Sequence, residues 1–164
     1  MHRIKVVNDV GDLVSIFHVA DSDVKRKVFQ EVTLKWCTME EIKEKYAEEG
    51  KEALTYLEKI KLVETQWKTT PEGPKKIYHT YYSIIQINIS CSIMEISDII
   101  YAATMTKKDI ENYENKIRNV IKGDEGVFFG DAVENLKVSE ILLRGVIKRS
   151  TNFEIKGHRI MDVS

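Results

Sequence analysis

Residues 38–78 read TMEEIKEKYAEEGKEALTYLEKIKLVETQWKTTPEGPKKIY, and the hydrophobic period changes within this stretch. Up to Lys59, apolar residues recur at helical spacing on either side of Ala47–Gly50, which predicts two short helices around a tight turn. After Leu62 apolar and polar residues alternate, which predicts a strand. The Pro- and Gly-rich residues 70–75 predict a turn and a returning strand. Helix, turn, helix and hairpin is the order of a winged helix-turn-helix.

The same order recurs in a smaller form near the C-terminus. A helix is expected from Asp131, and Ser139 caps a second helix that ends at Arg149. Two extended arms then flank the turn at Lys156-Gly157. The sequence therefore predicts an α+β protein, mainly α, with tandem winged helix-turn-helix units joined by a helical connector.

Domain boundaries follow from these patterns. Residues 1–91 are expected to form an N-terminal winged helix-turn-helix domain that binds DNA. Residues 92–122, with a capping box at Ser92 and Glu95, are expected to form the helical connector and a dimerisation element. Residues 123–164 are expected to form the smaller C-terminal unit.

Composition limits the class of protein. The 164 residues are 43% hydrophobic and 31% charged, which is typical of a folded chain and excludes a disordered one. The 25 basic and 26 acidic side chains give a net charge of -1, so a nucleic-acid surface would need local segregation of charge. Only Cys37 and Cys91 are present, without metal-ligand spacing, so no metal site, no cofactor and a cytoplasmic, reducing location are expected. No export signal and no membrane-spanning stretch is apparent, and no membrane partner is expected.

The expected partner is double-stranded DNA. In a winged helix-turn-helix the second helix enters the major groove and the wing lies along the phosphates. The candidates for the groove helix are polar or basic: Lys51, Thr55, Tyr56 and Lys59. The candidates for the wing are Lys68, Lys75 and Lys76. Glu52 and Glu58 weaken the local field, and the alternative is that these charges only solvate a helix face.

The C-terminal unit carries its own basic candidates. The expected outward cations of its last helix, which could bind phosphate, are Arg144, Lys148 and Arg149. The alternative is that this unit is a packing or dimerisation module whose charges keep the surface soluble.

The N-terminal half resembles the ArsR-like winged-helix transcription regulators over about residues 10–85. The matching residues precede the helix-turn-helix, leave the groove helix and form the wing: Ala20-Asp21-Ser22, Arg26, Val28, Leu54, Leu57, Leu62-Val63-Glu64, Gly73, Lys75, Lys76 and Tyr78. The resemblance implies a homodimeric repressor or activator that binds an inverted repeat, with flanking helices at the dimer contact. The chain departs from the family at Ile60-Lys61, and it lacks the paired cysteines of the metal-sensing members.

Two further expectations concern partners. The connector residues Ile93, Ile96, Ile99 and Ile100 form a broad apolar face, which predicts a homodimer. A protein-interaction module that docks on the transcription machinery without reading sequence is the competing function, favoured by the acidic run from Glu40 to Glu52. An enzyme is not expected, because no acid, base and nucleophile occur together.

Overall fold

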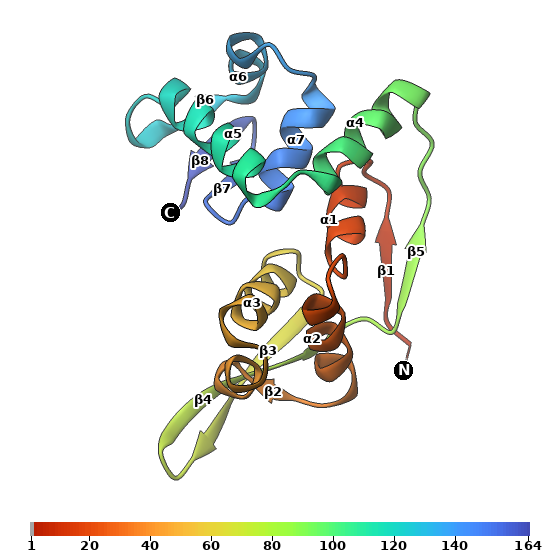
Figure 1. Ribbon diagram of the computed structural model, residues 1–164, viewed down its shortest axis with the longest axis vertical. Coiled ribbons are helices and arrows are strands. Elements are labelled where there is room, and N and C mark those ends of the chain that lie inside the picture. The colour runs from red at the N-terminus through yellow and green to blue at the C-terminus, as the bar shows by residue number, and fades with distance from the viewer. Residues whose placement is uncertain (1) are drawn as a thin grey trace. The chain divides into compact units, whose positions relative to one another are not determined.

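The computed structural model describes residues 2–164, which divide into two compact units. Unit 1 comprises the residues up to Val7 together with Val19–Asn88, and unit 2 comprises Asn8–His18 and Ile89–Ser164. The chain is an α+β protein in which helices predominate, which confirms the predicted fold class (Figure 1). The segment predicted as a separate connector, residues 92–122, belongs to unit 2.

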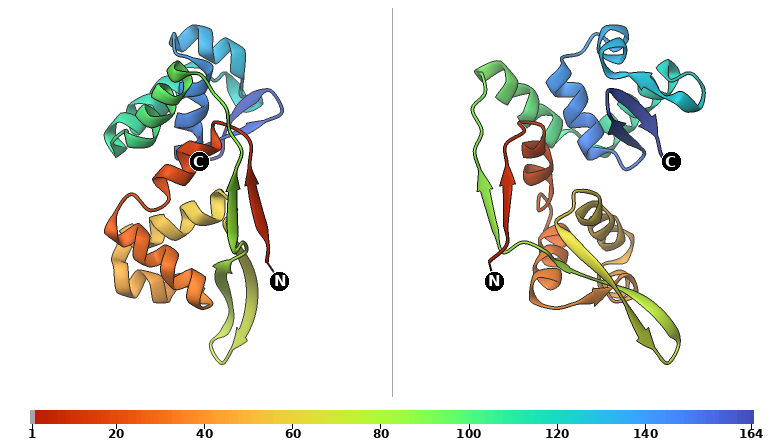
Figure 2. Two further views of the ribbon diagram at one scale, coloured as in Figure 1. Left: turned by 90° about the vertical axis from the view of Figure 1, so that its right-hand side faces the viewer. Right: turned by 180° about the vertical axis from the view of Figure 1, so that it is seen from behind.

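Unit 1 combines helices with a three-stranded sheet and a two-stranded ladder. The sheet has the order β2-β4-β3 and is antiparallel, whereas β1 and β5 pair in parallel. Both views in Figure 2 show the β3–β4 hairpin extending beyond the helices of this unit. Its elements are β1 (Ile4–Val7), α2 (Asp23–Leu34), β2 (Cys37–Thr38), α3 (Met39–Lys59), β3 (Val63–Thr70), β4 (Gly73–Thr80) and β5 (Ile84–Ile87).

The predicted helix-turn-helix lies within α3. The Thr38 hydroxyl accepts from the backbone N–H of Glu41, and the Glu41 carboxylate accepts from the N–H of Thr38 at 2.7 Å, which confirms the predicted capping box. Ala47 has φ 54° and ψ -147°, and this kink divides α3 into two helices. Gly50 lies where the helices approach closely, because a Cβ there would be 2.5 Å from the Cβ of Tyr46.

Exchange of Ala47 for glycine should raise the free energy of unfolding by about 1 kcal/mol. Positive φ costs an L-residue roughly 1–3 kcal/mol, and the added freedom of glycine in the unfolded chain offsets only part of that relief. Urea denaturation measures the change. Ala53→Gly, in the regular and buried part of α3, is the matched control and should destabilise. An equal decrease in the free energy of unfolding for Ala47→Gly and Ala53→Gly would show that Ala47 is not strained.

The core of unit 1 joins α2, α3 and the base of the sheet. Fully buried aliphatic side chains from α2 meet those of both halves of α3: Val28, Val32, Ile42, Leu54 and Leu57. Glu31 of α2 accepts hydrogen bonds from the Tyr46 hydroxyl at 2.6 Å and from the Lys45 ammonium at 2.9 Å. These bonds lower the pKa of Glu31, and they tie the first half of α3 to α2.

Unit 2 repeats the order helix, strand, helix, helix and hairpin. Its sheet has the order β6-β8-β7, so the last strand is central, as β4 is in unit 1. Helices α1 and α4 precede this repeat. The elements are α1 (Asp12–His18), α4 (Ile93–Thr104), α5 (Lys107–Val120), a 3-10 turn (Gly123–Glu125), β6 (Val127–Phe128), α6 (Phe129–Leu136), α7 (Glu140–Arg149), β7 (Phe153–Lys156) and β8 (Arg159–Asp162).

Helices α1, α4 and α7 share one apolar cluster within unit 2. Val14, Ile99 and Ala102 are fully buried there. At Gly145 of α7, a Cβ would lie 2.8 Å from the Cβ of Ala102 and 3.1 Å from Cγ2 of Val14, so the helices cross closely at this glycine. The expectation that Ile99 belongs to an exposed dimerisation face is wrong, because this side chain fills the core between α1 and α4.

Candidate nucleic-acid interface

The second half of α3 presents two of the predicted groove residues to solvent. Lys51 and Thr55 are exposed, while Leu54 and Leu57 are buried. The Lys51 ammonium lies 3.7 Å from the Glu48 carboxylate, an exposed ion pair that a phosphate can replace at little cost. The Thr55 hydroxyl donates to the Lys51 carbonyl at 2.9 Å, which leaves its oxygen able to accept from a base edge. Together they form a polar face suited to a DNA groove.

Tyr56 does not lie on this face. It is 6% exposed, so the expectation that its side chain points outward is wrong. The reason is helical geometry, since Tyr56 follows buried Ala53 by three residues and precedes Ile60 by four, which places it on the same apolar stripe. Lys59 is half-buried at the end of the helix. The groove face is therefore narrower than the sequence predicts.

The β3–β4 hairpin brings two of the predicted wing lysines together. Lys68 and Lys75 are direct cross-strand partners in the antiparallel ladder. Within residues 2–164 Lys68 makes no ion pair, and Lys75 has a carboxylate oxygen of Glu72 at 3.9 Å. Like charges in directly opposed positions destabilise a sheet. An anion between them, such as a DNA phosphate, would remove that repulsion.

Lys76 has a different role in this arrangement. Its ammonium donates a short hydrogen bond to the carboxylate of Glu58, near the end of α3. This bond raises the pKa of Lys76, so the side chain stays charged across the physiological range. The pair connects the groove helix to the wing and fixes their relative position. Lys76 is therefore held by Glu58 within unit 1, and phosphate contacts by Lys68, Lys75 and Lys76 stay predictions.

Trp67 is a candidate residue of the nucleic-acid interface that the sequence pattern did not identify. It is 72% exposed on β3, opposite Lys76. Trp67 alternates with polar residues, as in a strand with one buried face. In the hairpin, however, only Val63 and Tyr78 are buried, and both lie towards its base. Beyond them both faces of the hairpin meet solvent. The long arms around a Pro-Gly turn are the signal that could have indicated a projecting wing.

Acidic side chains lie close to the wing. A groove of about 340 Å³ is lined by Lys68 and Lys75 on one side and by glutamates of the first half of α3 on the other: Glu40, Glu41 and Glu44. These carboxylates reduce the positive potential on the side of the hairpin that carries Lys68 and Lys75.

The predicted cations of α7 are engaged inside unit 2. Arg149 donates to the carbonyl oxygens of Ala102, at 3.1 Å, and Met105 at the end of α4. Such carbonyls lack helical partners, so a guanidinium satisfies them and complements the helix dipole. Lys148 pairs with Asp12 at 2.8 Å. The Arg144 guanidinium lies 4.8 Å from the ring centre of Phe129. The expectation that Arg149 points outward is therefore wrong, whereas Arg144 and Lys148 are half-exposed and their contact with phosphate stays a prediction.

Among residues 2–164, no group of three or more His, Cys, Asp or Glu side chains is arranged to hold a metal ion. Over the same range, none of the helices combines the length and the apolar character needed to cross a bilayer.

Comparison with known proteins adds to this geometry. The family model of ArsR transcriptional regulators matches residues 7–164. The chain belongs to the ArsR family. The match covers both units, whereas the sequence resemblance covered only residues 10–85. No curated protein and no solved structure matched the chain. Membership of the ArsR family confirms the predicted resemblance and a role in transcriptional regulation.

Proposed function

We propose that this ArsR-family regulator binds DNA through unit 1, with the second half of α3 in the major groove and the β3–β4 hairpin on the phosphate backbone. The observation that carries the proposal is the direct cross-strand pair of Lys68 and Lys75 on a projecting hairpin. A phosphate placed beside this pair would offset the repulsion between the two ammonium groups. Lys51 and Thr55 supply the exposed polar face that base reading requires.

Retention of the full chain on immobilised random duplex tests this function. We expect retention at 50 mM salt and elution as the salt rises, because phosphate contacts release counterions. A chain that passes through the column at 50 mM salt would contradict the proposal.

A second candidate function is docking on a protein of the transcription machinery without reading DNA. The groove that places Glu40, Glu41 and Glu44 beside Lys68 and Lys75 favours it, because mixed charge suits a protein partner better than a phosphate backbone. This function predicts that the duplex column does not retain the chain.

We also propose that unit 2 is a second winged helix that packs and does not read DNA. Its order of elements and its strand order support the first part. The engagement of Lys148 and Arg149 within the unit supports the second.

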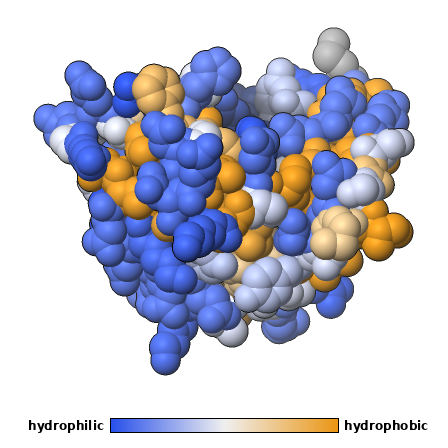
Figure 3. Space-filling view, turned by 90° about the horizontal axis from the view of Figure 1, so that it is seen from above, coloured by the Kyte–Doolittle hydropathy of each residue, from blue (hydrophilic) through white to orange (hydrophobic). Residues whose placement is uncertain are grey.

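The chain is proposed to act as a homodimer through the outer side of α4. Ile93 and Ile100 are seven residues apart and therefore lie on one side of the helix, with exposed fractions of 83% and 51%. Met94 and Tyr101 extend this surface and are also exposed. Apolar surface is visible over α4 at the lower right of Figure 3. A contiguous apolar patch of this kind is typical of a protein interface.

Replacement of Ile93 and Ile100 together by glutamate should convert the dimer to a monomer. Four glutamates would face one another across an isologous interface, which weakens association by several kcal/mol. Light scattering after size exclusion at micromolar concentration measures the mass. Asn115→Glu on the exposed side of α5 is the control and should remain dimeric. A wild-type monomer, or a dimeric double variant, would contradict this surface.

A further inference from the structure

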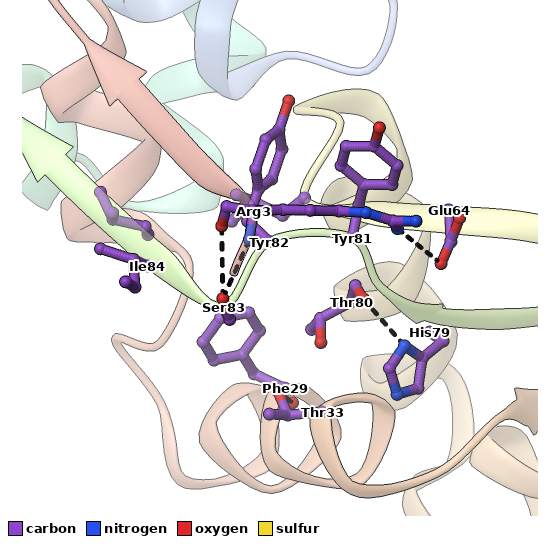
Figure 4. A pocket seen from close by; sticks show the side chains of 12 residues that line it. Arg3, Phe29, Thr33, Glu64, His79, Thr80, Tyr81, Tyr82, Ser83 and Ile84 are labelled. Carbon is purple, nitrogen blue, oxygen red and sulfur yellow. Dashed lines mark hydrogen bonds and ion pairs between the residues drawn. The ribbon is translucent and has the colours of Figure 1, made fainter. Parts of the chain in front are cut away.

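A pocket of about 820 Å³ in unit 1 is not used by the proposed DNA contacts (Figure 4). It lies where β4 ends and the chain passes into β5. Residues from several separate segments line it, including Arg3, Phe29, Glu64, His79, Tyr81 and Tyr82. Its volume is within the range of pockets that hold small organic molecules.

Four of the twelve residues that line the pocket carry aromatic rings. Tyr81 and Tyr82 meet edge to face, with ring centres 4.9 Å apart. His79 is held by stacking on Trp36 at 5.1 Å, and its Nδ1 lies 2.8 Å from the Thr80 carbonyl oxygen. Phe29 of α2 contributes a further ring. Flat faces and ring edges of this kind favour a planar aromatic ligand.

Cationic groups stand beside these rings. The Arg3 guanidinium lies 4.3 Å from the centre of the Tyr81 ring, and the Lys5 ammonium lies 5.3 Å from that of Tyr82. Arg3 donates through Nη1 to Oε1 of Glu64 at 3.4 Å, a long hydrogen bond that occupies only one of its five side-chain N–H donors. The remaining donors form the fork that binds a carboxylate at two points. Among the residues that line the pocket, Glu64 is the one carboxylate and Arg3 is the one cation other than His79.

The position of Arg3 is fixed by the backbone. Its N–H donates to the Ser83 hydroxyl at 3.2 Å, and its carbonyl oxygen accepts from the backbone N–H of Ser83 at 2.9 Å. The parallel pairing of β1 with β5 continues from this point. These bonds hold the backbone of Arg3 at the pocket, and the contacts with Tyr81 and Glu64 direct its guanidinium there, which lowers the entropic cost of binding an anion.

We propose that this pocket binds an aromatic carboxylate. The ring of the ligand lies among Phe29, Tyr81 and Tyr82, and its carboxylate accepts hydrogen bonds from Arg3. Because β4 also carries Lys75, the ligand would occupy the base of the strand that forms the wing.

Calorimetric titration of the full chain with naphthalene-2-carboxylate, without DNA, tests the proposal. For a ligand of this size we expect a Kd between about 0.02 and 1 mM. Naphthalene-2-carboxamide, which has the same shape without the charge, should bind at least about tenfold more weakly. Arg3→Gln should raise the Kd of the carboxylate by about tenfold or more, since charge-assisted hydrogen bonds are lost. Lys27→Gln, an exposed change on α2, should leave it unaltered.

Thermal melting of each variant without ligand checks that it folds. If Arg3→Gln fails to fold, Tyr81→Ala replaces it, because this side chain is 41% exposed and its ring forms part of the wall; it too should weaken binding. Absence of binding, equal affinity for the carboxylate and the carboxamide, or an unchanged Kd in the folded variant would each overturn the proposal. Since no DNA is present, failure here is distinct from failure of the proposed function.

Discussion

Alanine at both Lys68 and Lys75 should lower the affinity of the chain for a random duplex roughly 60-fold at 0.1 M salt. Each phosphate contact contributes about 0.9 to the slope of log affinity against log salt, so two lost contacts reduce its magnitude by about 1.8. The difference between variant and wild type should therefore shrink as the salt approaches 1 M. Fluorescence anisotropy of a labelled duplex, titrated at several salt concentrations, measures both quantities.

The matched control for the wing is alanine at both Lys27 and Lys43. These lysines are exposed on unit 1, pair with Asp23 and Glu48, and do not belong to the hairpin. The control removes the same charge and should change the slope by much less. Stability should stay level or rise in the wing variant, because the repulsion between opposed lysines is gone. Identical slopes for the two variants would show that the wing does not contact phosphates.

Leucine at Gly145 should lower the free energy of unfolding of unit 2 by about 3 kcal/mol or more. Even a methyl group would lie 2.8 Å from the Cβ of Ala102 and 3.1 Å from Cγ2 of Val14, so α7 must move away from α4 and α1. That movement strains the hydrogen bonds from Arg149 to the end of α4 and separates buried apolar surfaces. Urea denaturation followed by circular dichroism measures the loss.

Gly130→Leu is the matched control for this position. Gly130 lies in α6 with open space where a side chain would be, so the same exchange there should stabilise by about 0.5–1 kcal/mol through helix propensity. The free energy of unfolding is expected to fall with leucine at Gly145 and to rise with leucine at Gly130. Stabilisation at both would mean that α7 is not closely packed in solution.

The parts of the fold that the sequence predicted depend on local interactions. The capping boxes at Thr38 and Glu41 and at Ser92 and Glu95 close within four residues, so their spacing is visible in the sequence. The turn at Gly73 likewise depends on a positive φ of 116°, which glycine readily adopts. Such features need no knowledge of distant contacts.

The residues that the sequence misplaced depend on tertiary contacts. In the sequence Arg149 has the position of an outward cation on an amphipathic helix. The carbonyl groups that it binds belong to residues at the end of α4, 44 and 47 positions earlier in the chain. The sequence predicts an outward Tyr56 because it does not show how wide the apolar side of α3 is. That width depends on which other elements pack against the helix, and Tyr56 is buried by them. The pocket joins Arg3 to Tyr81 through the pairing of β1 with β5, a long-range contact with no local signal.

Selection of source-genome fragments by the purified full-length protein, followed by sequencing, tests most directly whether unit 1 reads DNA. Sequence-specific binding by unit 1 predicts enrichment of fragments that share an inverted repeat. It also predicts that Lys51→Ala with Thr55→Ala abolishes this enrichment while most non-specific affinity remains. Recovered fragments with the same distribution as the input, for the wild-type protein, would contradict it.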